Sequence, residues 1–247
     1  MNHIELTNEV EMNTAGITAY VNILPDLTKF NDFKMTLDFN SCCLDRKTDK
    51  MVEIITDIFL RPKFLNDLDY LKSLIDQLSM YESNSIMRSG SKFAKINAAS
   101  HLSNSSLMTE KFEGISSVHF INQVASKENI EEIAEKLQKI AKLILRKNNT
   151  RVLLTAESSQ FDSFSKSVNS IFLNSLKDEQ VNQSKLPLFQ PKQSKNFIGI
   201  PSQINFCSQA QTCLPYMNDD YPIVNVSIKI FISIFKHFLE IVDFENH

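Results

Sequence analysis

The chain has 247 residues, of which 43% are hydrophobic, so it can hold one large domain, or one domain and part of another. Its net charge of −3 argues against a general affinity for nucleic acid, and its four glycines argue against a Gly-rich phosphate loop. Four cysteines in a chain of this size favour a reducing compartment over a disulfide framework.

Neither a targeting segment nor a membrane span is evident. The first residues do not have the pattern of a signal peptide or of an Arg- and Ser-rich transit segment. The most apolar run, residues 223–235, is too short for a membrane span and contains Asn225 and Lys229. We therefore expect no nucleic acid and no membrane among the partners of this chain.

Two segments in the first forty residues have the alternation of strands. Residues 9–24 alternate from Val10 and Met12 onward and lead to Pro25. Residues 33–39 alternate strictly between apolar and polar side chains, which predicts a strand with one buried face. Because the two segments are about a hairpin apart, we expect them to form an antiparallel pair.

Several helices are predicted next. Thr48 can cap a helix that begins at Asp49 and is ended by Pro62, and Asn66 can cap the following helix. Two glycines are expected to interrupt the helical stretch: Gly90, and Gly114 between helices over residues 105–113 and 115–125. The predicted buried stripes consist of Met51, Ile54, Ile55, Ile58 and Phe59, and of Leu68, Leu71, Leu74, Ile75 and Leu78.

The remaining half alternates between ordered and polar segments. Ser126 can cap a helix with its apolar stripe at Ile130, Ile133, Leu137, Ile140 and Ile144. Residues 151–156 predict a short strand and residues 161–172 a further helix. Residues 174–196 are rich in Asn, Gln, Ser and Lys and predict a linker, after which residues 197–206 predict a strand broken by Pro201.

No histidine stands in a complete metal-binding motif. The five histidines are scattered: His3, His101, His119, His237 and His247. His237 and Glu240 begin an HxxE, but Ile241 stands where HxxEH needs its second histidine, and isoleucine cannot ligate zinc. We interpret His237 as a solvated histidine near a helix end, and His119 as packed or surface-exposed.

The other reactive side chains also have structural interpretations. Cys42 and Cys43 follow a strand and are interpreted as small buried hydrophobes rather than reactive thiols. No GxSxG is present, which argues against an elbow-type serine nucleophile. Two pairs of adjacent carboxylates are read as a solvated helix face (Glu131, Glu132) and as a turn (Asp219, Asp220). We therefore assign no catalytic, cofactor-binding or metal-binding residue.

Several segments together carry a family resemblance. They are Thr14-Ala15-Gly16-Ile17-Thr18-Ala19-Tyr20, Cys43-Leu44-Asp45-Arg46 with Met51, Ile55, Ile58-Phe59, Pro62 and Phe64, Ser89-Gly90-Ser91 with Ala98-Ala99, Phe112-Glu113-Gly114-Ile115, Ile204-Asn205-Phe206 and Leu214-Pro215-Tyr216. These segments resemble the C-terminal half of the presequence proteases, which are pitrilysin-type (inverzincin) zinc metallopeptidases. The resemblance covers roughly residues 12–237.

The resemblance implies a two-part enzyme. Such enzymes consist of four related α+β units in two halves, which close around a chamber for unfolded peptides. The N-terminal half binds zinc through HxxEH and a distal Glu. The C-terminal half supplies chamber wall and an Arg and a Tyr, near a Gly-Gly pair, that help to hold substrate. The resemblance thus implies peptide substrates, the N-terminal catalytic half as a partner, and the mitochondrial matrix as the location.

The implied fold class is α+β, with an antiparallel sheet packed against several long helices. We expect a third-unit-like domain over residues 1–175, a linker over 176–196 and a truncated start of the fourth unit over 197–247. The sequence contains no HxxEH, and it ends about where the Arg…Gly-Gly…Tyr segment is expected. We therefore expect no cofactor in this chain, since zinc belongs to the full-length family, and no catalysis by the chain alone.

The resemblance and the periodicity disagree over one segment. Residues 223–235 alternate between apolar and mostly polar side chains, which indicates a strand, whereas the resemblance implies a helix; we favour the helix.

Three functions stay open: a partial chain of a presequence-protease-type peptidase, a non-catalytic scaffold or binding subunit that pairs with a zinc-bearing peptidase chain, and a small binding domain unrelated to peptidases. We favour the first.

Overall fold

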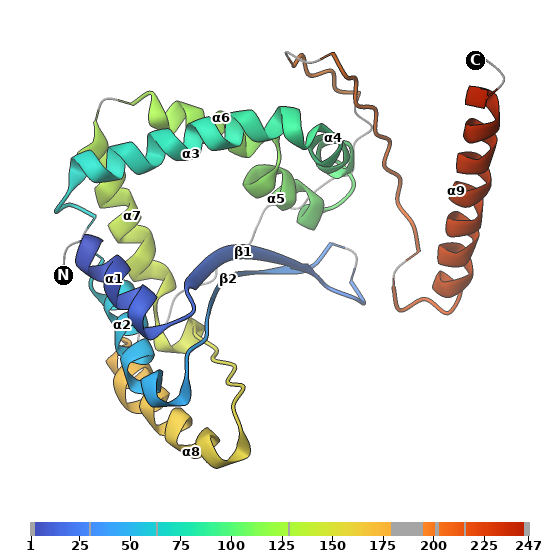
Figure 1. Ribbon diagram of the computed structural model, residues 1–247. Coiled ribbons are helices and arrows are strands. Elements are labelled where there is room, and N and C mark those ends of the chain that lie inside the picture. The colour runs from blue at the N-terminus through green and yellow to red at the C-terminus, as the bar shows by residue number, and fades with distance from the viewer. Residues whose placement is uncertain are drawn as a thin grey trace. The chain divides into compact units, whose positions relative to one another are not determined.

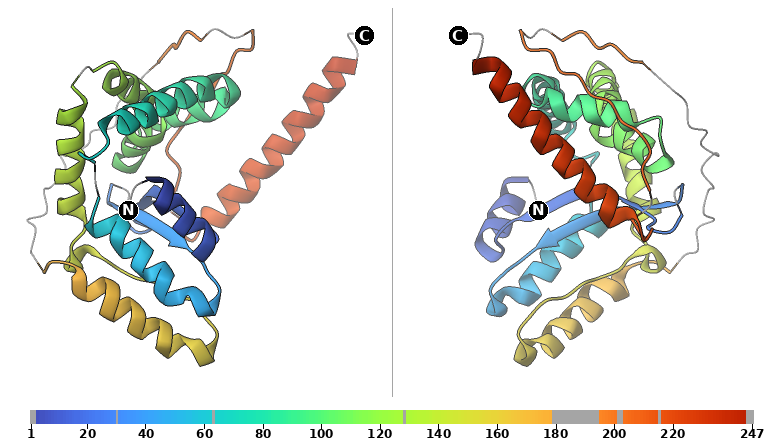
Figure 2. Two further views of the ribbon diagram at one scale, coloured as in Figure 1. Left: turned by 60° about the vertical axis from the view of Figure 1, so that its left-hand side comes forward. Right: turned by 90° about the vertical axis from the view of Figure 1, so that its right-hand side faces the viewer.

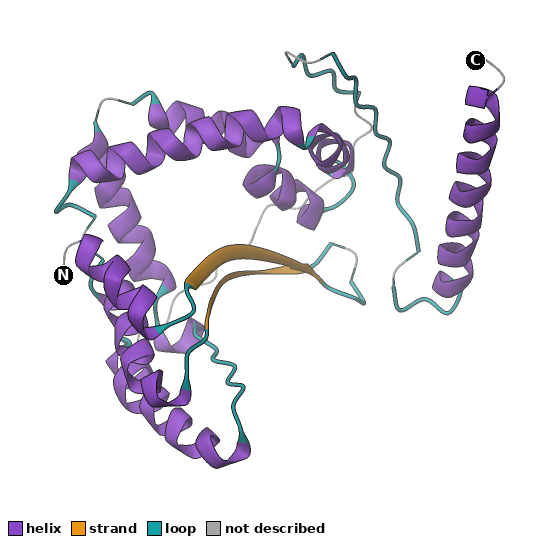
Figure 3. Cartoon of the chain, in the orientation of Figure 1, coloured by secondary structure: helices purple, strands orange, loops and turns teal. Residues whose placement is uncertain are grey.

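The computed structural model describes residues 3–29, 31–62, 64–127, 129–178, 195–200, 203–214 and 216–244, with the side chains of residues 235–244 excepted. Figure 1 labels the elements, and Figure 3 distinguishes the helices from the strand pair. In chain order they are α1 His3–Asn13, β1 Ile17–Pro25, β2 Phe33–Ser41, η1 Asp45–Lys47, α2 Thr48–Leu60, α3 Leu68–Arg88, α4 Gly90–Ala99, α5 Asn104–Glu113, α6 Ile115–Ala125, α7 Ile130–Ile144, η2 Lys147–Asn149, α8 Ser158–Ser167, η3 Val168–Phe172, η4 Leu173–Ser175 and α9 Tyr221–Phe244.

Two units follow from the packing of these elements. Unit 1 comprises Met1–Asn22, Thr36–Arg88 and Ser116–Leu188, and unit 2 comprises Ile23–Met35, Ser89–Ile115 and Phe189–His247. The predicted boundaries at residues 175 and 197 stay predictions, because residues 179–194 of the expected linker lie outside the described residues. The predicted α+β class is confirmed, with helices predominating over one two-stranded antiparallel sheet.

The predicted hairpin is confirmed. β1 pairs with β2, and the Asp26 amide donates to the Asp32 carbonyl at 2.8 Å where the strands leave the sheet. At the other end the Ser41 hydroxyl donates to the Gly16 carbonyl at 3.0 Å. Gly16 has a φ of +103°, so the chain enters β1 through a backbone conformation that favours glycine.

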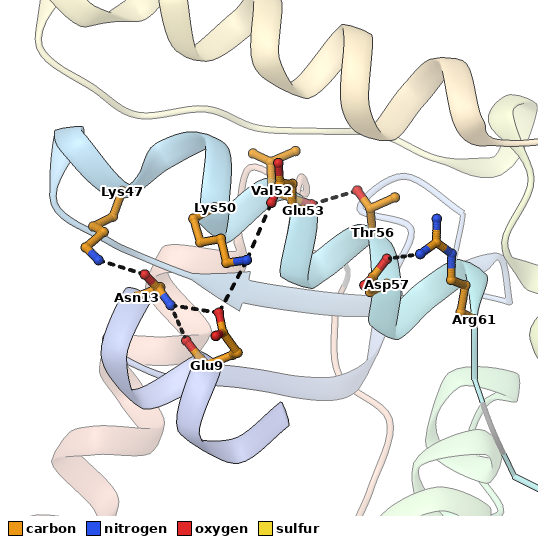
Figure 4. Close-up of polar contacts among 9 residues, drawn as sticks. All are labelled: Glu9, Asn13, Lys47, Lys50, Val52, Glu53, Thr56, Asp57 and Arg61. Atoms are coloured by element: carbon orange, nitrogen blue, oxygen red, sulfur yellow. Dashed lines mark hydrogen bonds and ion pairs between the residues drawn. The ribbon is translucent and has the colours of Figure 1, made fainter. Parts of the chain in front are cut away.

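One strand prediction was wrong at its beginning. Val10 and Met12 lie in helix α1, which packs on α2. Figure 4 shows the polar contacts between these helices: Lys47 donates from Nζ to Asn13 Oδ1 at 2.8 Å, and Lys50 Nζ lies 3.4 Å from a Glu9 carboxylate oxygen. Two alternating apolar residues are too few to specify a strand, and the partner helix decides the conformation.

Helix α2 carries much of the core of unit 1, as its apolar stripe predicts. Met51 and Ile54 are buried, and so is Val52, which belongs to a cluster with Val168, Phe172 and Leu176. In Figures 1 and 2, α8 lies beside α2 in every view, which agrees with the packing of Phe59 and Phe164 against that cluster. The predicted helix over residues 161–172 is confirmed as α8 followed by the π-helical turn η3.

Three predicted caps were wrong, although the helices they were assigned to exist. Thr48 is the first residue of α2 and donates its hydroxyl to the Asp45 carbonyl instead of accepting an amide. Asp67, not Asn66, accepts from the Tyr70 amide at 3.0 Å before α3. Asn129, not Ser126, accepts from the Glu132 amide at 3.1 Å before α7. In each case several capping residue types stand close together in the sequence, so type alone did not select one.

The two predicted glycine interruptions are confirmed. Gly90 begins α4, directly after α3 has ended at Arg88, and Gly114 separates α5 from α6. At Gly90 a Cβ atom would lie 2.3 Å from the ring of Phe206, so the absence of a side chain permits this contact within unit 2.

Two further strand predictions were wrong. Residues 151–156 are extended but belong to no strand, and neither do the described residues between Phe197 and Phe206; Pro201 itself lies outside the described residues. A strand needs a partner as well as a propensity, and none of the described segments pairs with either stretch.

The conflict over residues 223–235 is decided in favour of the helix. They lie within the continuous helix α9 (Figure 3), and several of its apolar side chains are half or more exposed, among them Ile223, Ile230 and Ile234. No helix within the described part of the chain has the length and apolar character needed to span a membrane.

Candidate functional site

The histidines are not assembled into a metal site. His3 stacks on the ring of Tyr70 with a centroid separation of 4.2 Å, and His119 is exposed on α6. The side chain of His237 lies outside the described residues. Across the described residues, no group of three or more His, Cys, Asp or Glu side chains could hold a metal ion. These residues do not fit the zinc that the family resemblance implies, and the prediction that the chain lacks a cofactor stays a prediction.

The adjacent carboxylates lie where the sequence predicts. Glu131 and Glu132 are in the first turn of α7, and Lys136 hydrogen-bonds to Glu132 and lowers the pKa of that carboxyl. Asp219 and Asp220 lie in the turn before α9, where the Asp220 amide donates to Asn218 Oδ1 at 2.9 Å. Both arrangements stabilise local structure.

The two adjacent cysteines differ in environment. Cys42 is exposed, so its predicted burial was wrong. Cys43 is half-buried, and this burial raises the pKa of its thiol, against the opposing effect of the hydrogen bond with Thr48. A raised pKa lowers the fraction of reactive thiolate at neutral pH, so Cys43 is not an activated nucleophile.

A buried carboxylate in unit 2 was not found by sequence reasoning. Glu110 on α5 is only 5% exposed, and its Oε1 accepts from Asn97 Nδ2 on α4 at 3.4 Å. Asn97 in turn accepts from Asn196 Nδ2 at 2.9 Å. A Cβ atom on Gly114 would lie 2.0 Å from Glu110 Oε2. The sequence signal was a Glu four residues before a helix-ending glycine, which is too common a pattern to indicate burial.

The hairpin has one apolar face, made by the odd-numbered residues of both strands. Near α2 this face is covered, because Phe39 meets Phe59 edge-on with a centroid separation of 4.3 Å. Leu37, two residues earlier on the same face, is 39% exposed. The opposite face is polar, and Asn40 there donates to the Tyr20 hydroxyl at 3.0 Å. The prediction of one buried face is thus met only near α2.

A second exposed feature of unit 1 is the extended segment 151–157 between η2 and α8. Leu154 packs against the core cluster of α2 and η3, whereas the neighbouring Leu153 is 93% exposed. Figure 1 shows this segment as a yellow strand-like loop leading into α8. Such a segment can hydrogen-bond to another extended backbone, so the two apolar, strand-like surfaces of unit 1 are suited to polypeptide binding rather than to bond cleavage.

Comparison with known proteins places the chain in a family. The profile of the family described as "Peptidase M-16C associated" matches residues 1–124, which is half of the chain. The chain belongs to this peptidase-associated family. It is also similar to three proteins named "Presequence protease, mitochondrial". The identity is 24% with that of Mus musculus and 24% with that of Xenopus laevis, each over 96% of this chain. It is 27% with that of Saccharomyces cerevisiae, over 87% of this chain.

The coverage of these relatives is one-sided. The alignments span 26% of the mouse and frog proteins and 23% of the yeast protein, so the chain spans about a quarter of the length of the curated relatives it matches. The predicted resemblance to presequence proteases is therefore confirmed, for a section of such a protein.

Proposed function

We propose that this chain forms part of the peptide-enclosing wall of a presequence-protease-type zinc metalloendopeptidase and does not cleave peptides by itself. The observation that carries the proposal is the extent of the match: 96% of this chain aligns with only 26% of the mouse relative. The sequence contains no HxxEH, and generation of a nucleophile from metal-bound water requires such ligands. In this role the chain contributes binding surface, and a zinc-bearing section contributes the chemistry.

The proposal includes substrate and location. The substrates are unfolded peptides, which the exposed apolar and strand-like surfaces of unit 1 are suited to contact through backbone hydrogen bonds and apolar side chains. The location is the mitochondrion, and within it the matrix; support comes from the names of the relatives, all three of which contain the word mitochondrial.

The test uses the purified full chain with zinc and an extended oligopeptide. We expect no stoichiometric zinc and no hydrolysis by the chain alone, and chelator-sensitive hydrolysis after a chain with HxxEH is added. Stoichiometric zinc together with chelator-sensitive turnover by the chain alone would overturn the proposal. The variants H237A and H119A form a matched pair for that outcome, because only His237 begins an HxxE.

A second candidate is a non-catalytic scaffold subunit that pairs with a separate zinc-bearing peptidase chain. The exposed apolar side chains of α9 favour it, since Phe231 and Ile234 are 65% and 64% exposed and a partner would cover them. Co-purification in a defined stoichiometry with an HxxEH chain would support this candidate. A monomer that only aggregates when concentrated would count against it.

A further inference from the structure

The segment Arg151 to Glu157 has the form of a strand that lacks its neighbour. Its residues are extended, and the backbone is still extended at Glu157, with φ of −62° and ψ of 147°. Leu154 is held against the core of unit 1, which orients the segment. The side chains that alternate with it, those of Leu153 and Thr155, are exposed.

The backbone of this segment is available for pairing. Within the described residues, no backbone hydrogen bond involves the amides or carbonyls of residues 151–156. A hydrogen bond joins Arg151 to the Thr150 carbonyl through the guanidinium, which leaves the backbone of Arg151 itself unused. Water satisfies exposed backbone groups, but a row of them on a preformed extended segment is also a template for another strand.

The sequence of the segment is complementary to itself in one antiparallel register. With Leu154 on a two-fold axis, Arg151 of one copy lies opposite Glu157 of the other, and the same pair recurs at the far end. Leu153 then lies opposite Thr155 and diagonal to the second Leu153, within reach of it. An isologous contact of this kind is the one that closes a two-fold dimer.

We infer that two copies of this chain associate by antiparallel pairing of residues 151–157, with Arg151–Glu157 ion pairs at both ends and the two Leu153 side chains in contact. A second copy is favoured over an unrelated extended peptide because the peptide would satisfy the backbone but not, in general, both charges. The inference does not depend on the proposed function, since it concerns assembly and not peptide cleavage.

The experiment is a charge exchange on the full chain, followed by sedimentation velocity over a range of concentrations. In R151E both ion pairs become repulsive contacts between carboxylates, and in E157R both become repulsive contacts between cations. We expect each single variant to raise the dimer dissociation constant about tenfold or more. The double variant R151E/E157R restores opposite charges at both ends and is expected to dimerise like the unmodified chain. A mixture of R151E with E157R is expected to form the mixed dimer for the same reason.

The control variant is R61E, which reverses the charge of an exposed arginine paired only with Asp57 on its own helix, and it is expected to leave the dimer unchanged. Hydrogen exchange on the unmodified chain is a test that needs no variant: the amides of residues 152–156 should exchange more slowly as concentration rises. Equal association of all variants would attribute it to another surface, such as α9, and would overturn the inference. Failure of the double variant to recover, absence of any dimer, or exchange that is independent of concentration would do the same.

Discussion

Gly114 illustrates how one missing side chain can hold a helix junction together. The chain must leave α5 and enter α6 at this residue, while the Glu110 carboxylate and carbonyl both lie against its Cα. A Cβ atom there would be 2.0 Å from Glu110 Oε2 and 2.7 Å from the Glu110 backbone oxygen. The carboxylate is buried and the carbonyl belongs to the helix, so neither is free to move away.

We therefore expect G114A to lower the free energy of unfolding by about 1–3 kcal/mol, as overpacking of a filled site does. The measurement is urea denaturation followed by circular dichroism. G199A is the matched control, because no atom lies within 4 Å of a Cβ atom at Gly199. Equal stability of the two variants would show that the junction relaxes without cost.

The turn between β1 and β2 contains the carboxyl group with the largest described pKa shift. Asp26 Oδ1 accepts from the Thr28 hydroxyl at 2.7 Å and from the amides of Thr28 and Lys29 at 2.8 and 2.9 Å. These hydrogen bonds, that of the Thr28 side chain first, lower the pKa of Asp26 from 3.8 to about 2.

Because the folded pKa is depressed, the ionised carboxylate stabilises the turn at pH values above 3.8, and this contribution is lost as pH falls toward about 2. We expect T28A to raise the Asp26 pKa toward 3.8, since it removes the largest cause of the shift. An NMR titration of the Asp26 carboxyl carbon measures it, with T36A, an exposed threonine of the same hairpin, as the control. A pKa unchanged by T28A would contradict the hydrogen-bonding explanation.

At the scale of elements, α3 and α6 are joined by polar contacts rather than by apolar packing alone. The Ser79 hydroxyl donates to Asn122 Oδ1 at 2.6 Å, and Asn122 Nδ2 donates to Ser83 at 3.1 Å. Lys72 on α3 also donates to the carbonyl of Ala125, the last residue of α6, at 2.8 Å. A cation at this position satisfies a terminal helix carbonyl and interacts favourably with the helix dipole.

We expect N122A to lower the free energy of unfolding by about 1–3 kcal/mol, because it leaves part-buried serine hydroxyls without their partner. Chemical denaturation measures the change. Q123A is the matched control, since the neighbouring glutamine is exposed on the same helix. If both variants lost the same small amount of stability, the amide of Asn122 would be a surface feature and not a clamp.

The elements themselves were predictable where their signals are local. The alternation of residues 33–39 specified β2, and the glycines at 90 and 114 specified two helix boundaries. Cap residues were not predictable, because Asn66 and Asp67 are both suitable types and only the backbone conformation selects Asp67. The strand over residues 151–156 failed for a different reason: its conformation is extended as expected, but a strand also requires a partner far away in sequence.

At the scale of the whole molecule, the outstanding property is the amount of apolar surface on α9. Ile230, Ile232 and Ile234 are 55%, 49% and 64% exposed, and Phe231 is 65% exposed. A helix that is apolar over most of its circumference is ordinarily buried. The surface therefore indicates that α9 is built to be covered, in agreement with a chain that aligns with a section of much longer relatives.

We expect the double variant I230K/I234K to reduce binding of a hydrophobic dye and light scattering at high protein concentration, because it interrupts this surface. S227K/S233K is the matched control, as it adds the same two charges to α9 without removing apolar side chains. Equal effects of the two double variants would attribute the improvement to charge alone.

What the sequence by itself determined is local or cumulative: the hairpin, the helix interruptions, the resemblance to presequence proteases and the lack of an HxxEH. These follow from the chemistry of neighbouring residues and from many weak similarities added together. Only the tertiary structure decided that Glu110 is buried beneath Gly114, that Asn122 joins two helices, that Leu153 stands exposed while Leu154 is packed, and that residues 223–235 are helical. Burial and pairing depend on residues far apart in the chain, and an almost wholly apolar segment satisfies the periodicities of helix and strand alike.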